Sequence, residues 1–288
     1  LIAFTPSGDV LGLGRWWRRF ARSKGAVFGL AVFLAIVVMA VFAGVLAPYD
    51  PLTQGVGAPL EKPSLAYWAG TDSFGRDMLS RIIYGARVAL IVGIVAVLLA
   101  LVVGVTLGLV AGYYGGVLDA VIMRVMDALF AFPIIILAIA MMAIMGFGVT
   151  NVIIAVGVGF IAPFARVTRG DVLAVKEEPY IEAARLAGIG NLAIIFRHVL
   201  PNVLAPIIVQ GALRVSGAII TEAGLSFLGL GPPPPTPVWG SMIAEGRNFI
   251  VMAPHISTIP GVALMLTVVG LNLFGDGLRD ALDPRLRR

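Results

Sequence analysis

Residues 88–112 read VALIVGIVAVLLALVVGVTLGLVAG, a run that contains no charged residue. A helix of this length, at about 1.5 Å per residue, can cross the roughly 30 Å hydrocarbon core of a bilayer. The whole chain of 288 residues has the same character, because 59% of its residues are hydrophobic and only 13% are charged. Soluble domains are about 45–50% apolar and about 25% charged. The sequence therefore excludes a water-soluble globular fold and predicts an integral membrane protein.

Five more apolar stretches are long enough to span a membrane, at 25–47, 121–146, 149–165, 203–225 and 257–274. Helices satisfy their own backbone polar groups within lipid, so we predict an all-α fold with six transmembrane helices. The predicted parts of the chain are a cytoplasmic N-terminal segment (1–24), a first helix with an external loop (25–87), and a core of five helices (88–288) with a cytoplasmic loop (166–202).

The distribution of basic residues predicts the orientation. The first apolar stretch, 23 residues long, exceeds the 7–15 residues of a signal-peptide core, so we expect an uncleaved anchor with its N-terminus in the cytoplasm. Fifteen Lys and Arg residues then lie on the cytoplasmic side and five on the external side, as the positive-inside rule requires. An even number of spans returns the C-terminus to the cytoplasm. Five of the cytoplasmic residues precede the first span: Arg15, Arg18, Arg19, Arg22 and Lys24.

Catalytic and cofactor-binding patterns are missing from the sequence. No lysine follows a glycine, so the chain has no phosphate-binding P-loop of its own, and it contains no cysteine. The two histidines, His198 and His255, fall on opposite predicted sides of the membrane, and no metal-ligand spacing occurs. The net charge of +5 comes without a basic patch interleaved with aromatic residues. We therefore predict a chain that is not an enzyme, binds no cofactor or metal itself, and contacts lipid but no nucleic acid.

Charged residues inside spans are costly and are candidates for function. Gln210 and Arg214 are four residues apart, so they share one helix face, and Glu222 lies nearer the external end. We consider two roles for Arg214, a structural ion pair or a place in the lining of a transport pathway.

The cytoplasmic loop contains the sequence EEPYIEAARLAGIG at residues 177–190. Pro179 suits the first position of a helix, and Gly188 is expected to end that helix after two to three turns. A helix so short is marginal alone in water and needs a surface to pack on. Ala183 and Ala184 allow close approach, as a peg that enters a groove of another protein requires. A helix lying on lipid is the alternative, but the segment has few large apolar residues to support it.

Several local pairings follow from spacing alone. The residues Ile181, Ala184, Arg185 and Gly188 are expected to share one face of the cytoplasmic helix, and Asn191 to cap a second short helix that ends before Pro201. Asp77 with Arg81 and Arg124 with Asp127 are spaced to pair along a helix. Pro133 is expected to kink the third span, and Trp239 to be an interfacial anchor.

Glu182-Ala183-Ala184, then Gly188, then Leu200-Pro201 resemble the EAA motif of ABC-importer permeases, with the same spacing throughout and His198 where that motif has isoleucine. The resemblance implies that this loop is the coupling helix that docks into a cleft of a cytoplasmic ATPase. It assigns that role to Glu182, Ala183, Ala184, Arg185, Gly188, Leu200 and Pro201.

Further motifs are similar to the dipeptide/oligopeptide/nickel group of these permeases, and most similar to the C subunit of dipeptide transporters. They lie before span two, after span five (residues 222–231, followed by Trp239-Gly240) and in the C-terminal tail. The charged residues of the first and last motifs are Asp72, Arg76, Asp77, Arg81, Arg87, Asp276, Arg279 and Asp280.

The resemblance implies a type I importer permease in the cytoplasmic (inner) membrane of a bacterium or archaeon. Its partners would be a homologous permease, two cytoplasmic ATPases that hold ATP and Mg²⁺, and an external substrate-binding protein. Dipeptides or oligopeptides are the expected substrates, with nickel or glutathione as alternatives within the class. An ion-coupled secondary transporter is the alternative from another class.

Overall fold

The computed structural model describes residues 20–282, and the regular structure of this part of the chain is helical. The all-α prediction is confirmed. Residues 1–19, with most of the predicted N-terminal segment, and residues 283–288 lie outside the described part. The helices are α2 (Lys24–Val41), α3 (Ala43–Leu46), α4 (Met78–Tyr114), α5 (Gly116–Phe130), α6 (Ile134–Met145), α7 (Val149–Val175), α8 (Pro179–Leu186), α9 (Asn191–Ile194), the π-helical turn η1 (Ile195–Val199), α10 (Leu200–Phe227), α11 (Trp239–Arg247) and α12 (His255–Leu282).

Five of the predicted spans correspond to helices long and apolar enough to cross a membrane, namely α2, α4, α7, α10 and α12. The third prediction, one kinked helix over 121–146, is wrong in its geometry. The chain instead forms α5 and α6, which meet at 89°. Pro133 stands at the break with an extended backbone (ψ 133°) and, because proline has no N–H, it starts α6 without losing a hydrogen bond. Counted as one broken span, this pair brings the number of candidate spans in the described part to six.

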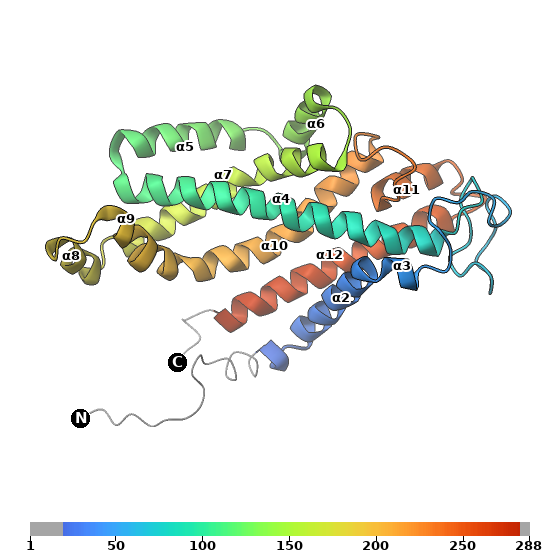
Figure 1. Ribbon diagram of the computed structural model, residues 1–288, viewed down its shortest axis with the longest axis horizontal. Helices are drawn as coiled ribbons and strands as arrows, with labels where there is room; N and C mark the ends of the chain where they lie inside the picture. The colour runs from blue at the N-terminus through green and yellow to red at the C-terminus, as the bar shows by residue number, and fades with distance from the viewer. Residues whose placement is uncertain (1–19, 283–288) are drawn as a thin grey trace.

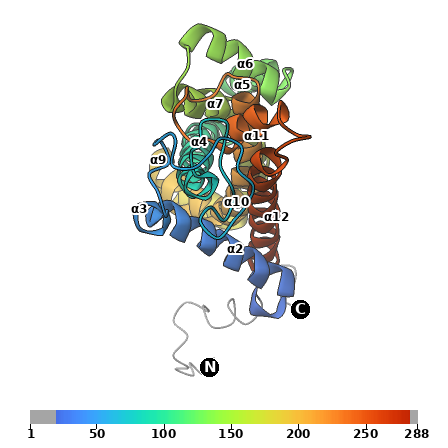
Figure 2. The same ribbon diagram turned by 90° about the vertical axis from the view of Figure 1, so that its right-hand side faces the viewer.

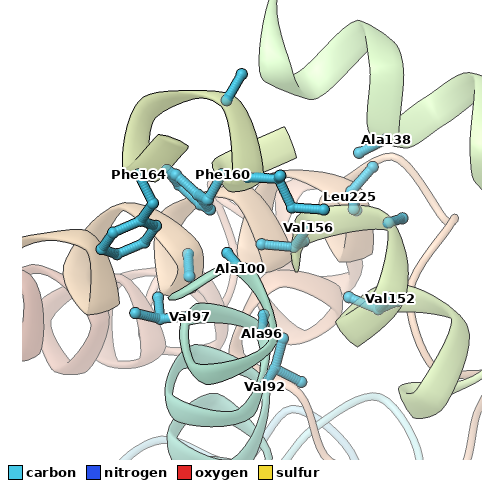
Figure 3. Close-up of a cluster of buried hydrophobic side chains, with 14 of the residues drawn as sticks. Val92, Ala96, Val97, Ala100, Ala138, Val152, Val156, Phe160, Phe164 and Leu225 are labelled. Atoms are coloured by element: carbon cyan, nitrogen blue, oxygen red, sulfur yellow. The ribbon is translucent and has the colours of Figure 1, made fainter. Parts of the chain in front are cut away.

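The long helix α4 lies at the centre of the bundle, in contact with α2, α7 and α10 (Figure 2). Its main neighbour is α7, and the apolar side chains of both helices interlock in one buried cluster (Figure 3). Val92, Ala96 and Ala100 of α4 meet Val156 and Phe160 of α7 there. Small residues let the two backbones approach closely. Close packing is needed because the hydrophobic effect does not drive helices together within lipid.

Three glycines spaced four residues apart, Gly104, Gly108 and Gly112, line the α4 face that touches α7. A Cβ atom at Gly108 would lie 2.6 Å from the Ala165 carbonyl oxygen and 2.7 Å from the Thr168 Cβ atom. Both atoms belong to a packed helix and cannot turn away. The two backbones therefore approach more closely than any other residue type would allow.

We expect Gly108→Ala to separate α4 from α7 and to destabilise the protein by about 1–3 kcal/mol, the usual cost of overpacking. Gly170→Ala is the matched control, since Gly170 is also helical and has no atom within 4 Å of the position that an added methyl group would take. Thermal unfolding in detergent checks both. Equal melting temperatures for the two variants would contradict close packing at Gly108.

The bundle has two different ends (Figure 1). The short helices α8 and α9 lie at one end, and the segment before α4 lies with α11 at the other. Trp239 opens α11 and is only 1% exposed, with its indole N–H donating to the Ile82 carbonyl oxygen over 3.0 Å. The predicted interfacial anchor is therefore wrong. The glycine at position 85 leaves space for the indole ring, because a Cβ atom there would lie 2.7 Å from that ring.

Candidate functional site

Helix α8 forms as its sequence predicts. Pro179 occupies its first turn, and Gly188 follows its end with φ +77°, a conformation that favours glycine. The Gly188 N–H donates to the Arg185 carbonyl and the Ile189 N–H to the Ala184 carbonyl, the double closure of a Schellman motif. Burial, and to a smaller extent the Glu178 charge, raise the pKa of the Tyr180 phenol above its usual value.

The side chains of α8 divide between two directions. Ile181 and Ala184 are buried, at 0% and 7% exposure, in a cluster with Tyr113 of α4 and Val172 of α7. Glu182, Ala183, Arg185 and Leu186 are exposed. The face predicted to combine Ile181 and Ala184 with Arg185 and Gly188 is thus split, because the first two pack on the chain's own bundle. Of the two alanines of the motif, only Ala183 faces outward.

A polar contact fastens this loop to the inner end of α4. The Tyr113 hydroxyl donates to the Asn191 Oδ1 over 2.9 Å, and the Arg185 guanidinium lies 5.4 Å from the centre of the Tyr113 ring. Asn191 therefore does not cap the next helix, whose N-cap is Gly190.

The helix predicted to end before Pro201 instead runs on. From α9 the chain passes through η1 into α10 as one continuous 37-residue helix, Asn191–Phe227. Pro201 lies in the first turn of α10. Leu200 is half-buried and Pro201 is exposed. The segment that contains α8 is thereby followed directly by a membrane-spanning helix.

Two ion pairs join α5 to α7. The Asp127 Oδ1 lies 2.6 Å from the Arg166 guanidinium, so the predicted pairing of Asp127 with Arg124 is wrong. Asp119 accepts two hydrogen bonds from Arg169, at 2.5 and 2.6 Å. These pairs cross between helices, so spacing along the chain carries no signal of them. Met123, Asp127, Arg166 and Arg169 line a cavity of about 320 Å³.

A buried charge cluster occupies the opposite end. Asp72 accepts from the Arg76 Nε at 2.6 Å and from the Arg81 guanidinium, and all three side chains are at most 4% exposed. Glu245 of α11 lies 3.6–3.7 Å from both guanidinium groups. Asp77 instead caps α4, accepting from the Ser80 N–H at 2.7 Å, so the predicted Asp77–Arg81 pair is wrong. A carboxylate at an N-cap accepts hydrogen bonds from the first backbone N–H groups of the helix, and is then not available to pair with a side chain one turn further on.

The other predicted residues are spread along the molecule. Arg87 is exposed and donates through its Nε to the Ala40 carbonyl at 2.9 Å. The last turns of α12 carry Asp276, Arg279 and Asp280, and all three are exposed. No group of three or more His, Cys, Asp or Glu side chains within residues 20–282 could hold a metal ion.

The three polar residues of α10 are not brought together. Glu222 is 1% exposed and accepts from the Ser226 hydroxyl at 2.6 Å. The Arg214 guanidinium lies 5.7 Å from the Phe160 ring of α7, and no salt bridge within the described part of the chain includes it. Gln210 is half-buried, and its Oε1 is buried without a hydrogen-bond partner.

The described part of the chain is thus a bundle of membrane-spanning helices with a short helix packed on one end. The chain belongs to the family described as binding-protein-dependent transport system inner membrane component, whose model matches residues 104–288. Residues 13–63 match the N-terminal transmembrane domain of oligopeptide transport permease C. The predicted ABC permease of the peptide group is confirmed, and the ion-coupled alternative is set aside.

Relatives agree with this family, and a solved structure agrees with its fold. The chain is 48% identical over 273 residues to the glutathione transport system permease protein GsiD of Shigella flexneri serotype 5b, covering 94% of this chain and 90% of the relative. It is 49% identical, with the same coverage, to GsiD of Salmonella typhimurium. An inward-facing structure of the MetNI methionine ABC transporter matches with a TM-score of 0.58 at 20% identity, over 72% of this chain and 98% of that one. The type I importer fold follows, in a bacterial inner-membrane protein.

Proposed function

We propose that this chain is one of two homologous permease subunits that import short peptides, including glutathione, and that α8 docks on a cytoplasmic ATPase. ATP and Mg²⁺ would be held by the two ATPases, and a binding protein would deliver the substrate at the external end. Support for the substrate class comes from the GsiD relatives, which are permeases of glutathione transport systems. The observation that carries the docking proposal is the exposure of Ala183 and Leu186 on a helix whose other face is anchored.

The anchored face explains how movement would be transmitted. Ile181 and Ala184 pack in the same cluster as Tyr113, at the end of α4, and Val203, at the start of α10. A displacement of α8 by the ATPase pair therefore shifts the inner ends of both helices together. Such coupling requires the ATPases to hold α8 differently in their open and closed states, since only a difference in contact energy shifts an equilibrium.

The test uses proteoliposomes that contain the complete complex, with ATP inside and the binding protein outside. We expect uptake of radiolabelled glutathione or dialanine to require both ATP and the binding protein. Uptake that continues without ATP would contradict the proposal, and so would failure of both probes.

The same vesicles test the docking surface, because the chain contains no cysteine. Ala183→Cys introduces a thiol on the exposed face, and Ala184→Cys introduces one on the buried face as a matched control. A maleimide that carries a photoreactive benzophenone, attached to the thiol and irradiated, should link Ala183→Cys, and not Ala184→Cys, to an ATPase subunit. Adducts of Ala183→Cys with lipid alone would overturn the docking of α8.

A further inference from the structure

We propose that Arg214, together with Gln210, holds a carboxylate-bearing substrate at the middle of the membrane. The inference rests on the proposed function and adds a binding site to it. Arg214 lies eleven residues from each end of the apolar stretch 203–225. At about 1.5 Å per residue, about 16 Å of apolar helix lies on either side of Arg214. A permanent positive charge is most costly at this depth, so it needs a negative group to offset it.

The described part of the chain supplies no such group. Helices α4 and α6 pack against α10 and contain no acidic residue. Helices α7, α11 and α12 also pack against α10, and none of their acids (Asp171, Glu245, Asp276 and Asp280) forms a salt bridge with Arg214. The one acid of α10 is Glu222, eight residues or about 12 Å further along the axis, and it accepts from Ser226. The guanidinium group instead lies over the Phe160 ring. A cation–π contact leaves its five N–H donors free for a planar anion, and carboxylate is the anion that this fork fits.

Gln210 lies one turn before Arg214 on the same face of α10. Its side-chain Oε1 is buried without a hydrogen-bond partner. A buried acceptor without a donor is rare and costly in a folded protein. The Gln210 Oε1, an acceptor without a donor, thus lies one turn from the Arg214 guanidinium, a donor group without an acceptor. This combination fits a small molecule that carries a carboxylate beside an ammonium or amide N–H, and a peptide terminus has both.

The face that carries these two residues is partly open at Arg214, while the Gln210 Oε1 lies beneath the surface. Arg214 is half-buried, and so are Gly217 and Thr221, which continue the same face toward the external end. Gly217 has no side chain, and a Cβ atom there would touch only the Phe160 ring, at 3.4 Å. The result is a half-open strip from the middle of α10 outward, with its one charge at the inner end. A carboxylate that descends along the strip meets Arg214 without any rearrangement of α10.

The experiment measures glutathione and dialanine uptake by the complete complex in proteoliposomes. Arg214→Gln removes the charge and should lower uptake by about tenfold or more, the loss expected for one charge-assisted interaction. Arg214→Lys keeps a cation and should restore most of it. Ile220→Ala is the control, because Ile220 is 51% exposed on another face of α10. Direct contact is read by placing the photoreactive residue p-benzoylphenylalanine at Thr221, which should attach labelled substrate only while Arg214 is present.

Three outcomes overturn the inference. Arg214→Gln could transport at the parent rate, or the photoreactive residue could label only the partner permease. A third is that Arg214→Gln separates the two permeases on gel filtration, which would make Arg214 half of an ion pair between subunits. A parent complex that carries neither probe would instead refute the peptide assignment, and the inference with it. If the parent complex transports a probe and one of the three outcomes above is found, the inference about Arg214 fails while the peptide assignment stands.

Discussion

Gly188→Asp is expected to abolish uptake while the protein stays in the membrane. Gly188 ends α8 on the side that faces away from the bundle, and no atom lies within 4 Å of the position a side chain would take. The added side chain therefore meets no atom of this chain and acts on whatever docks there. A carboxylate that is buried without a partner costs several kcal/mol, which corresponds to weakening the docking by more than about 100-fold.

Backbone strain must be separated from charge, because Gly188 has φ +77°. Gly229 offers a matched control at the other end of the molecule. It has φ +80°, it closes α10 with the same pair of hydrogen bonds, and it too has no atom within 4 Å of a side-chain position. Gly229→Asp should therefore carry the same strain, about 1–2 kcal/mol, without the loss of uptake.

Gly188→Asn completes the comparison, since it has the shape of Asp without the charge. We expect uptake by this variant to fall between those of the parent and Gly188→Asp. The measurement is initial uptake in proteoliposomes, with the amount of each variant in the membrane determined by immunoblot. Equal losses for Gly188→Asp and Gly229→Asp would assign the effect to strain and refute docking at Gly188.

Features set by a few neighbouring residues can be predicted from the sequence. The start of α8 at Pro179 and its end at Gly188 depend on the missing N–H of proline and the positive φ of glycine. The five long spans depend on composition alone. The sequence predicts the break at Pro133 only as a kink, because proline marks an interruption but neighbouring helices decide its angle.

Contacts between different helices cannot be predicted from the spacing of residues in the sequence. Spacing rules pair residues on one helix, so they assign Asp127 to Arg124, whereas the fold brings Arg166 of α7 to 2.6 Å. The burial of Trp239 depends on the space left by Gly85, far earlier in the chain. The anchoring of α8 has the same limit. Ile181 and Ala184 have an apolar spacing, but nothing local tells whether that face meets the chain's own bundle or a partner.

The buried cluster around Asp72 gives the largest expected effect on stability. Asp72 is 1% exposed and receives hydrogen bonds from two guanidinium groups and from the backbone N–H groups of Phe74 and Arg76. Asp72→Ala leaves Arg76 and Arg81 buried with Glu245 alone, at 3.6–3.7 Å. Removing one partner of a buried charge pair costs about 3–5 kcal/mol. The Arg81 Nε, which is buried and already without a partner, adds to the polar atoms left unsatisfied.

Asp127→Ala is the matched control, because it removes the same carboxylate from an ion pair in which both side chains are exposed, at 39% and 57%. Its expected cost is about 0–1 kcal/mol. Thermal unfolding of the purified protein in detergent measures both variants. A melting temperature for Asp72→Ala no lower than that of Asp127→Ala would show that the cluster does not stabilise the fold.

The double variant Asp72→Ala, Arg81→Met tests the cause of the loss. If the loss comes from an uncompensated guanidinium rather than from a missing contact, removing Arg81 as well should recover part of the stability. Arg76 then faces Glu245 as a single pair at 3.7 Å, with the cluster again neutral. Uptake should be measured together with the recovery of stability, because the same residues hold the external segment against α4 and α11. A double variant less stable than Asp72→Ala would mean that the Arg81 side chain stabilises this end by packing and not by its charge.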